Sequence, residues 1–128
     1  FSQVTLLGAT GGRPDHTFAN YSTLLYLARH GVENLMADET SEIRCIGPGV
    51  PLLLDGKPGH YLSVFAFGGP AKGVMERGVK YPLTNAELEP GYPLGVSNEF
   101  VEAQAEVSCT EGFLLVMTTP KDGALPLF

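Results

Sequence analysis

The feature that most constrains the fold is a glycine turn that joins a strand-like run to an amphipathic helix near the start of the chain. Val4 to Leu7 is apolar and β-branched enough for a buried strand. Pro14 suits a first helical position, and a helix is expected from Pro14 to about His30. Its apolar residues recur at spacings of three and four: Phe18, Tyr21, Leu24, Leu25 and Ala28. With a further strand near residues 34–37, the pattern predicts a right-handed crossover between parallel strands.

The turn between strand and helix has the chemistry of a phosphate site. Gly11 and Gly12 permit close backbone approach to a ligand, and free N–H groups at a helix start favour an anion. Arg13 adds a planar donor fork. Asp15 would repel a phosphate unless a divalent cation bridged them, so the pair indicates Mg²⁺ with a nucleotide or pyrophosphate. A purely structural interpretation is also open, because acidic first turns and glycine turns are common in α/β proteins.

Two further polar residues follow on the helix. His16 lies in the first turn, where the helix dipole disfavours protonation, so we expect a neutral imidazole that hydrogen-bonds a ligand. Asn20 lies one turn later on the same face. With Asp15 they can form a polar pocket wall, although an ordinary solvent-exposed helix face has the same pattern. No histidine pairs with a serine or cysteine in a nucleophile arrangement.

From about Ser41 onward the helical periodicity gives way to short strand-like runs separated by turns. Sixteen glycines and ten prolines fit this turn-rich plan. Predicted strands cover residues 42–46, 50–54, 61–67, 73–80, 103–109 and 113–118. In the fifth of these, alternation predicts an inward face made of Ala103, Ala105, Val107 and Cys109. The expected fold is therefore an α/β segment with a parallel sheet, residues 1–46, followed by a mostly antiparallel β-sandwich or barrel, residues 47–128.

Charge, hydropathy and cysteine content narrow the classes of function. The net charge of −6 and the lack of a basic patch argue against nucleic acid as a partner. No apolar run approaches the ~20 residues that span a bilayer, and no secretion signal stands at the start, so we expect a soluble, cytoplasmic protein without a membrane partner. Cys45 and Cys109 lie in separate strand-like runs and are expected to be buried thiols.

Two stretches of the β part carry polar and aromatic groups suited to a ligand. Ser97 and Asn98 offer donors and acceptors, in what we expect to be a loop, for the edge of a heteroaromatic base. Tyr81, within Gly78 to Leu83, can stack on a ring or attract a cation. Ser-Asn pairs in loops are mostly turn formers, so a structural role is the alternative.

These segments, in this order, resemble the thiamine pyrophosphokinase family. Gly-Gly-Arg-Pro-Asp-His at 11–16 is similar to the family's Gly-Gly-Arg-x-Asp-His segment. Residues 78–83 resemble its Gly-Leu-Lys-(Tyr/Trp)-x-Leu stretch, and residues 95–99 its (Ile/Thr)-Ser-Asn signature. The resemblance extends over nearly all of the chain. Family members also carry, ahead of the glycine turn, a Gly-Asp-x-Asp-Ser segment that binds Mg²⁺, and this sequence has no counterpart to it.

The resemblance implies a homodimeric enzyme that transfers pyrophosphate from ATP to thiamine, giving thiamine diphosphate and AMP. Residues 1–46 would be the C-terminal portion of its catalytic domain, and residues 47–128 its thiamine-binding domain. The pocket would form between the α/β lobe of one subunit and the β lobe of its partner. The implied phosphate-binding residues are Thr10, Gly11, Gly12 and Arg13, with Arg13 and Asp15 catalytic and Asp15 on Mg²⁺. The implied substrate-binding residues are His16, Asn20, Tyr81, Ser97 and Asn98.

The missing Asp-rich segment leads us to expect a piece of a longer protein that, alone, binds its ligand weakly and does not turn over. A non-catalytic ligand-binding or dimerisation module, with a purely structural glycine turn, is the alternative. A nucleotide hydrolase would need a water-activating base, which the sequence does not supply.

Overall fold

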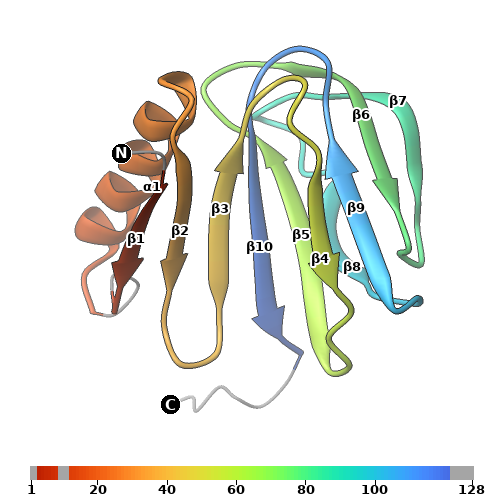
Figure 1. Cartoon of the computed structure of the whole chain (residues 1–128), viewed down its shortest axis with the longest axis horizontal. Coiled ribbons are helices and arrows are strands. Elements are labelled where there is room, and N and C mark those ends of the chain that lie inside the picture. The colour runs from red at the N-terminus through yellow and green to blue at the C-terminus, as the bar shows by residue number, and fades with distance from the viewer. Residues whose placement is uncertain (1–2, 9–11, 122–128) are drawn as a thin grey trace.

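The structure is a computed structural model that describes residues 3–8 and 12–121. These residues form one helix, α1 (Pro14–Arg29), and ten strands (Figure 1). The strands are β1 (Gln3–Leu7), β2 (Glu33–Ala37), β3 (Glu42–Ile46), β4 (Leu52–Asp55), β5 (His60–Ala66), β6 (Ala71–Arg77), β7 (Leu83–Leu88), β8 (Gly95–Glu99), β9 (Gln104–Ser108) and β10 (Leu114–Pro120). No described helix has both the length and the apolar character needed to cross a membrane.

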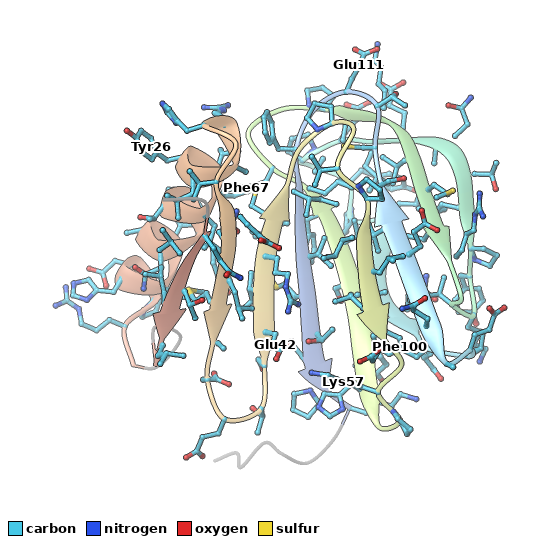
Figure 2. All side chains as sticks on the ribbon, viewed as in Figure 1. Tyr26, Glu42, Lys57, Phe67, Phe100 and Glu111 are labelled. Carbon is cyan, nitrogen blue, oxygen red and sulfur yellow. The ribbon has the colours of Figure 1, made fainter. Side chains whose placement is uncertain are left out.

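The opening strand, helix and second strand form the predicted parallel unit. β1 and β2 pair in parallel, and α1, which connects them, packs on β2 and β3. Leu24 of the helix is fully buried in a cluster with Met36. Phe18, on the predicted apolar stripe, is 60% exposed. It nevertheless meets Phe67 edge-on, with 6.1 Å between the ring centroids, and Figure 2 labels Phe67 beside the helix.

A single six-stranded sheet runs through the whole molecule in the order β1-β2-β3-β10-β5-β8 (Figure 1). β1 and β2 are parallel, and the other neighbours pair antiparallel. β3 belongs to both parts of the chain, because Cys45 packs beneath the helix whereas Ile46 joins the core of the β part. The division into residues 1–46 and 47–128 stays a prediction.

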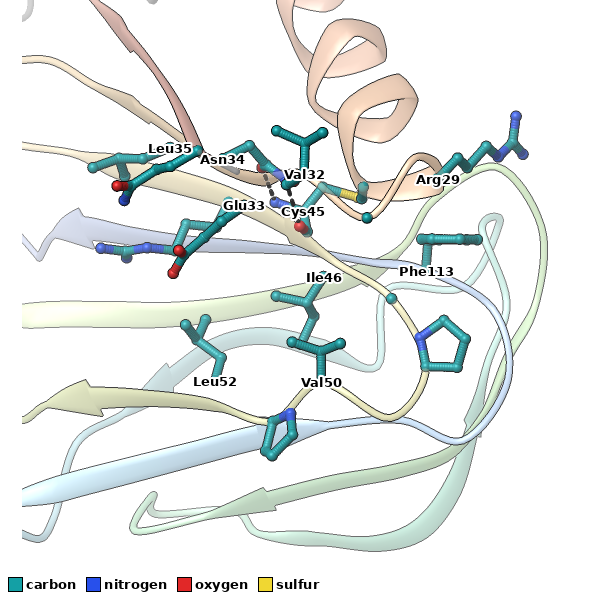
Figure 3. Close-up of a pocket in the computed structure, with 17 residues that line it drawn as sticks. Arg29, Val32, Glu33, Asn34, Leu35, Cys45, Ile46, Val50, Leu52 and Phe113 are labelled. Carbon is teal, nitrogen blue, oxygen red and sulfur yellow. Dashed lines mark hydrogen bonds between the residues drawn. The ribbon is translucent and has the colours of Figure 1, made fainter. Parts of the chain in front are cut away.

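A buried side chain extends the short pairing between β2 and β3. Their backbones are in register only at Met36–Ile43 and Ala37–Glu42. Beyond that point the side chain of Asn34 makes the hydrogen bonds to β3. Its Oδ1 accepts from Cys45 N at 2.8 Å and its Nδ2 donates to Cys45 O at 2.9 Å (Figure 3). The amide of Asn34 thus acts as one more peptide group in the ladder.

A second sheet of four strands, β4-β9-β6-β7, packs against the β half of the first. Leu62, Val64 and Leu114 from one sheet and Val74, Leu88 and Val107 from the other form one core. At one end, Lys57 Nζ lies 3.4 Å from Glu42 Oε1, and Figure 2 labels both residues there. The expected mostly β fold with parallel and antiparallel pairing is confirmed at this level.

The structure corrects two expectations about the β part and confirms a third. Ser97 and Asn98 lie on strand β8, so the prediction of a loop was wrong. Ala103 is exposed and precedes β9, so the inward face begins at Ala105. The cysteines are free and buried as expected, and burial raises the pKa of the Cys45 thiol to about 12.

Candidate functional site

The predicted ligand-binding residues fall into two groups, at opposite edges of the six-stranded sheet. Gly12, Arg13 and Asp15 follow the outer strand β1. Ser97 and Asn98 lie on β8, the outer strand at the other side. Four strands lie between β1 and β8. At about 4.8 Å per neighbouring pair, the two edges are about 24 Å apart, so one chain does not bring the two groups into one pocket.

The first group is organised around an ion pair at the start of α1. Gly12 has φ +83°, and Arg13 is extended at the N-cap before Pro14. Arg13 donates from Nε to Asp15 Oδ1 at 3.2 Å and from Nη2 to Oδ2 at 2.7 Å. Both side chains are about two-thirds exposed, at 66% and 65%. Thr10 and Gly11 lie outside the described residues.

This geometry suits an anion better than a metal ion. The guanidinium lies at the positive end of the helix, and an incoming phosphate can replace the Asp15 carboxylate on it. Asp15 is a single carboxylate whose oxygens are taken by Arg13 and by the N–H of His16. No three His, Cys, Asp or Glu residues gather as a metal site within residues 3–8 and 12–121. The described residues therefore do not fit a Mg²⁺ site by themselves.

His16 and Asn20 lie one turn apart on α1, as their spacing predicted. His16 is exposed, whereas Asn20 is half-buried. Both belong to the Arg13 edge of the sheet and lie far along the sheet from β8. Their assignment to a ligand stays a prediction.

The second group is held by Asn98, which is only 4% exposed. Its Oδ1 accepts from Tyr81 N and from Glu99 N, each at 3.0 Å. Its Nδ2 donates to Tyr81 O at 2.9 Å and to Glu76 Oε1 at 3.2 Å. An amide has no further hydrogen-bonding capacity of this kind, so Asn98 anchors the backbone of Tyr81 instead of facing a ligand. The Tyr81 ring is 63% exposed, with Lys80 Nζ 5.5 Å from its centroid.

Ser97 has a left-handed backbone, with φ +61°, although it is not a glycine. The pairing of β5 with β8 is irregular between Leu62 and Val64, opposite this residue. Ser63, which lies between them, accepts from Ser97 N through its Oγ at 2.9 Å. The bulge leaves the Ser97 side chain exposed at the sheet edge. Strained, exposed polar residues of this kind often mark binding sites.

Two residues behind this surface were not foreseen from the sequence. Ser63 lies on β5 and Glu76 on β6, far along the chain from β8. Glu76 has no exposed surface, and its Oε2 has no hydrogen-bond partner. Burial raises the pKa of Glu76 to about 7, although the Asn98 hydrogen bond lowers it. The available signal was alternation, since Glu76 stands two residues after Val74 on the inward face.

A separate cavity of about 760 Å³ opens near the end of α1, between β2, β3 and the loop into β4 (Figure 3). Its lining includes the apolar side chains of Ile46, Val50 and Phe113 and the charged ones of Arg29, Glu33 and Arg44. None of the predicted site residues lines it. This cavity and the predicted site are therefore different places on the molecule.

Comparison with known proteins identifies relatives for both parts of the chain. Residues 52–114 match the family described as "Thiamin pyrophosphokinase, vitamin B1 binding domain". A curated relative, the thiamine pyrophosphokinase of Bacillus subtilis (strain 168), is 26% identical over 114 residues, which cover 89% of this chain and 53% of the relative. The chain thus spans about half the length of the curated relative that it matches.

Solved structures of thiamin pyrophosphokinases are also similar to this chain. The thiamin pyrophosphokinase of Geobacillus thermodenitrificans matches with TM-score 0.81 and 30% identity, over 96% of this chain and 56% of that one. The Bacillus subtilis thiamine pyrophosphokinase has the same fold, with TM-score 0.86 and 24% identity over 94% of this chain and 56% of that one. Residues 52–114 thus match the vitamin B1 binding domain of the thiamin pyrophosphokinase family, and the chain is similar to members of that family over most of its length.

Proposed function

We propose that this chain forms part of an enzyme that transfers pyrophosphate from ATP to thiamine, giving thiamine diphosphate and AMP. The observation that carries the proposal is the surface around β8, where side chains hydrogen-bond the backbones of an exposed tyrosine and a strained serine within the matched vitamin B1 binding domain. The thiazolium of thiamine is a cation, which the face of Tyr81 attracts. Its aminopyrimidine needs donors and acceptors, which the Ser97 hydroxyl supplies.

The glycine turn and Arg13 would hold the phosphate groups. Pyrophosphate transfer depends on positioning and on neutralising negative charge more than on a protein nucleophile. The N-terminus of α1 and the Arg13 guanidinium provide positive charge at one place. Asp15 holds that guanidinium in position until an anion arrives, and His16 and Asn20 would line the same side of the pocket.

A homodimer would complete the site. The residues proposed to bind phosphate and those on β8 lie at opposite edges of one sheet. A second copy can place its β8 beside the α1 of the first. In this arrangement residues 1–46 contribute the phosphate side and residues 47–128 the thiamine side.

Magnesium would accompany ATP. Asp15 is the residue of this chain to which the family resemblance assigns the ion. Since the Arg13 guanidinium engages both Asp15 oxygens, the described residues alone do not hold the ion.

A titration of the ¹⁵N-labelled chain, followed by NMR, tests the proposal. Thiamine should shift the amide resonances of Tyr81 and Ser97, whereas inorganic pyrophosphate should shift those of Gly12 and Arg13. Tyr81→Ala should weaken thiamine binding about tenfold, the loss expected for a desolvated cation–π contact. Tyr26→Ala is the matched control, because the two rings are 62% and 63% exposed and Tyr26 lies on α1, away from β8.

The titration tests thiamine binding, and a separate assay tests synthesis of thiamine diphosphate. Shifts confined to α1 with thiamine, or equal weakening by both tyrosine variants, would contradict the thiamine surface. The chain mixed with ATP, Mg²⁺ and thiamine should form no thiamine diphosphate by itself. Robust synthesis by the chain alone would contradict that expectation while supporting the activity.

A further inference from the structure

The Glu76 carboxyl links the two sheets directly beneath the proposed thiamine surface. Glu76 belongs to β6 of the four-stranded sheet, whereas Asn98 belongs to β8 of the six-stranded sheet. Glu76 Oε1 accepts from Asn98 Nδ2 at 3.2 Å, and the side chain is completely buried. Across the sheet, Glu76 is in register with the apolar residues Leu83 and Val107. Asn98 is thus the polar partner of this carboxyl.

This contact decides which way the Asn98 amide faces. The oxygen end meets two backbone N–H groups, from Tyr81 and Glu99. The nitrogen end meets two acceptors, Tyr81 O and Glu76 Oε1. Turning the amide over would set its oxygen against two oxygens and its nitrogen against two donors. Removing the Glu76 acceptor leaves one buried N–H unpaired and weakens this preference.

Gly95 of β8 leaves the space that the Glu76 carboxyl occupies. A Cβ placed on Gly95, the first residue of β8, would lie 2.6 Å from Val64 O and 3.4 Å from Glu76 Oε2. A side chain at this position would therefore collide with the neighbouring backbone. Because residue 95 is a glycine, β8 closes over the buried carboxyl without a gap for another side chain.

We propose that Glu76 is a positioning residue of the ligand site, which fixes the Asn98 amide and through it the backbone of Tyr81 and the end of β8. The inference rests on the proposed function for its ligand, thiamine. Glu76 does not touch the ligand. It acts by keeping the exposed Tyr81 ring and the Ser97 bulge in one arrangement, which lowers the ordering that binding requires.

Four chains compared by NMR test this role: the unchanged chain, Glu76→Leu, Glu76→Gln and Val74→Ala. Leucine removes the acceptor and replaces a buried polar group with an apolar one, so the chain should fold. Glutamine keeps an acceptor oxygen for Asn98. Val74→Ala is the control, because Val74 is fully buried on the same strand and the same face.

In Glu76→Leu, the amide resonances of Tyr81 and Glu99 should shift and broaden, and thiamine affinity should fall about tenfold, as for one buried group left unpaired. Glu76→Gln should restore the resonances and bring the affinity back to within about threefold. Val74→Ala should lower the stability without changing either readout. Glu76→Leu and Val74→Ala are therefore distinguished by the amide resonances and the thiamine affinity, and not by stability.

Each contrary result has a definite meaning. Unchanged Tyr81 and Glu99 resonances in Glu76→Leu would overturn the inference, whether or not thiamine binds. Equal loss of affinity in Glu76→Gln, or in Val74→Ala, would overturn it as well, because the acceptor would then not be the cause. If the unchanged chain bound no thiamine, the proposed function would fail, and the two amide resonances would still decide the role of Glu76.

Discussion

Among single residues, Asn98 shows both what sequence reasoning reached and where it stopped. The residue types and the motif of the Ser-Asn pair predict a ligand surface, which stays a prediction. The sequence could not indicate that Asn98 is buried, because its partners Glu76 and Tyr81 come from other segments and meet it only after the sheets pack. The left-handed backbone of Ser97 was equally hidden, since it depends on the bulge opposite Ser63.

The buried Glu76 makes the stability of the chain depend on pH. Burial raises its pKa from the ordinary value of 4.5 to about 7, so the folded state holds this proton more tightly than the unfolded state. Between these two values the folded state binds more protons, and stability falls as the pH rises. Ionisation should cost about 3 kcal/mol, a loss complete above pH 7 and absent below the unfolded value.

Urea unfolding of the unchanged chain and of Glu76→Gln, at several values from pH 4.5 to pH 8, measures this effect. The difference between the free energies of unfolding of the two chains should change by about 3 kcal/mol between pH 4.5 and pH 8. A constant difference would show that Glu76 does not titrate there.

At the level of elements, the helix and the strands with a regular apolar pattern could be predicted, and the irregular edges could not. The strand at residues 42–46 has the predicted limits, and the helix begins at Pro14 as predicted and ends within one residue of the predicted end, because apolar positions recur there with a clear period. β7 and β8 were missed. Most of their residues are exposed or half-buried at sheet edges, so they lack the alternation that identifies a strand.

Asn34 gives a test of how β2 and β3 are joined. The Asn34→Ala variant loses the hydrogen bonds with Cys45 N and Cys45 O and leaves both buried groups unpaired. We expect a loss of about 2–3 kcal/mol in the free energy of unfolding. Glu33→Ala, an exposed change on the same strand, should alter it by less than about 0.5 kcal/mol. Urea unfolding compares them, and similar losses would argue against a special role for the Asn34 amide.

For the whole molecule, the decisive feature is that the two halves of the proposed site lie on the outer strands of one sheet. The residue types at each half could be recognised from sequence, because glycine turns and motifs are local. The distance between the two halves could not be predicted, because it depends on β10 and β5 pairing in the sheet between β3 and β8. Sequence spacing carries no information on that strand order.

The proposed site, shared between two copies, predicts complementation in the proposed enzyme. Asp15→Ala and Asn98→Ala should each reduce thiamine diphosphate synthesis about tenfold or more, since each damages one side of every site. In a mixture, a dimer of one variant with the other has one site without either substitution. Random re-association should therefore restore roughly a quarter of the normal activity, which a coupled assay for AMP would detect.

The control mixes two preparations of the Asn98→Ala protein, which should keep the low activity of that variant. A mixture of the two variants whose activity stays equally low after subunit exchange would place both residues in the same copy's site. Full activity of both single variants would favour a ligand-binding or dimerisation module.

Within residues 3–8 and 12–121, strand pairing continues across the sheet from β1 to β8 and joins the two edges that carry the proposed site. The two halves keep a fixed spacing within each copy. In the proposed dimer, a movement that encloses the substrates would therefore take place where one copy slides or tilts against the other. The rate of product release would then depend on the stiffness of that contact.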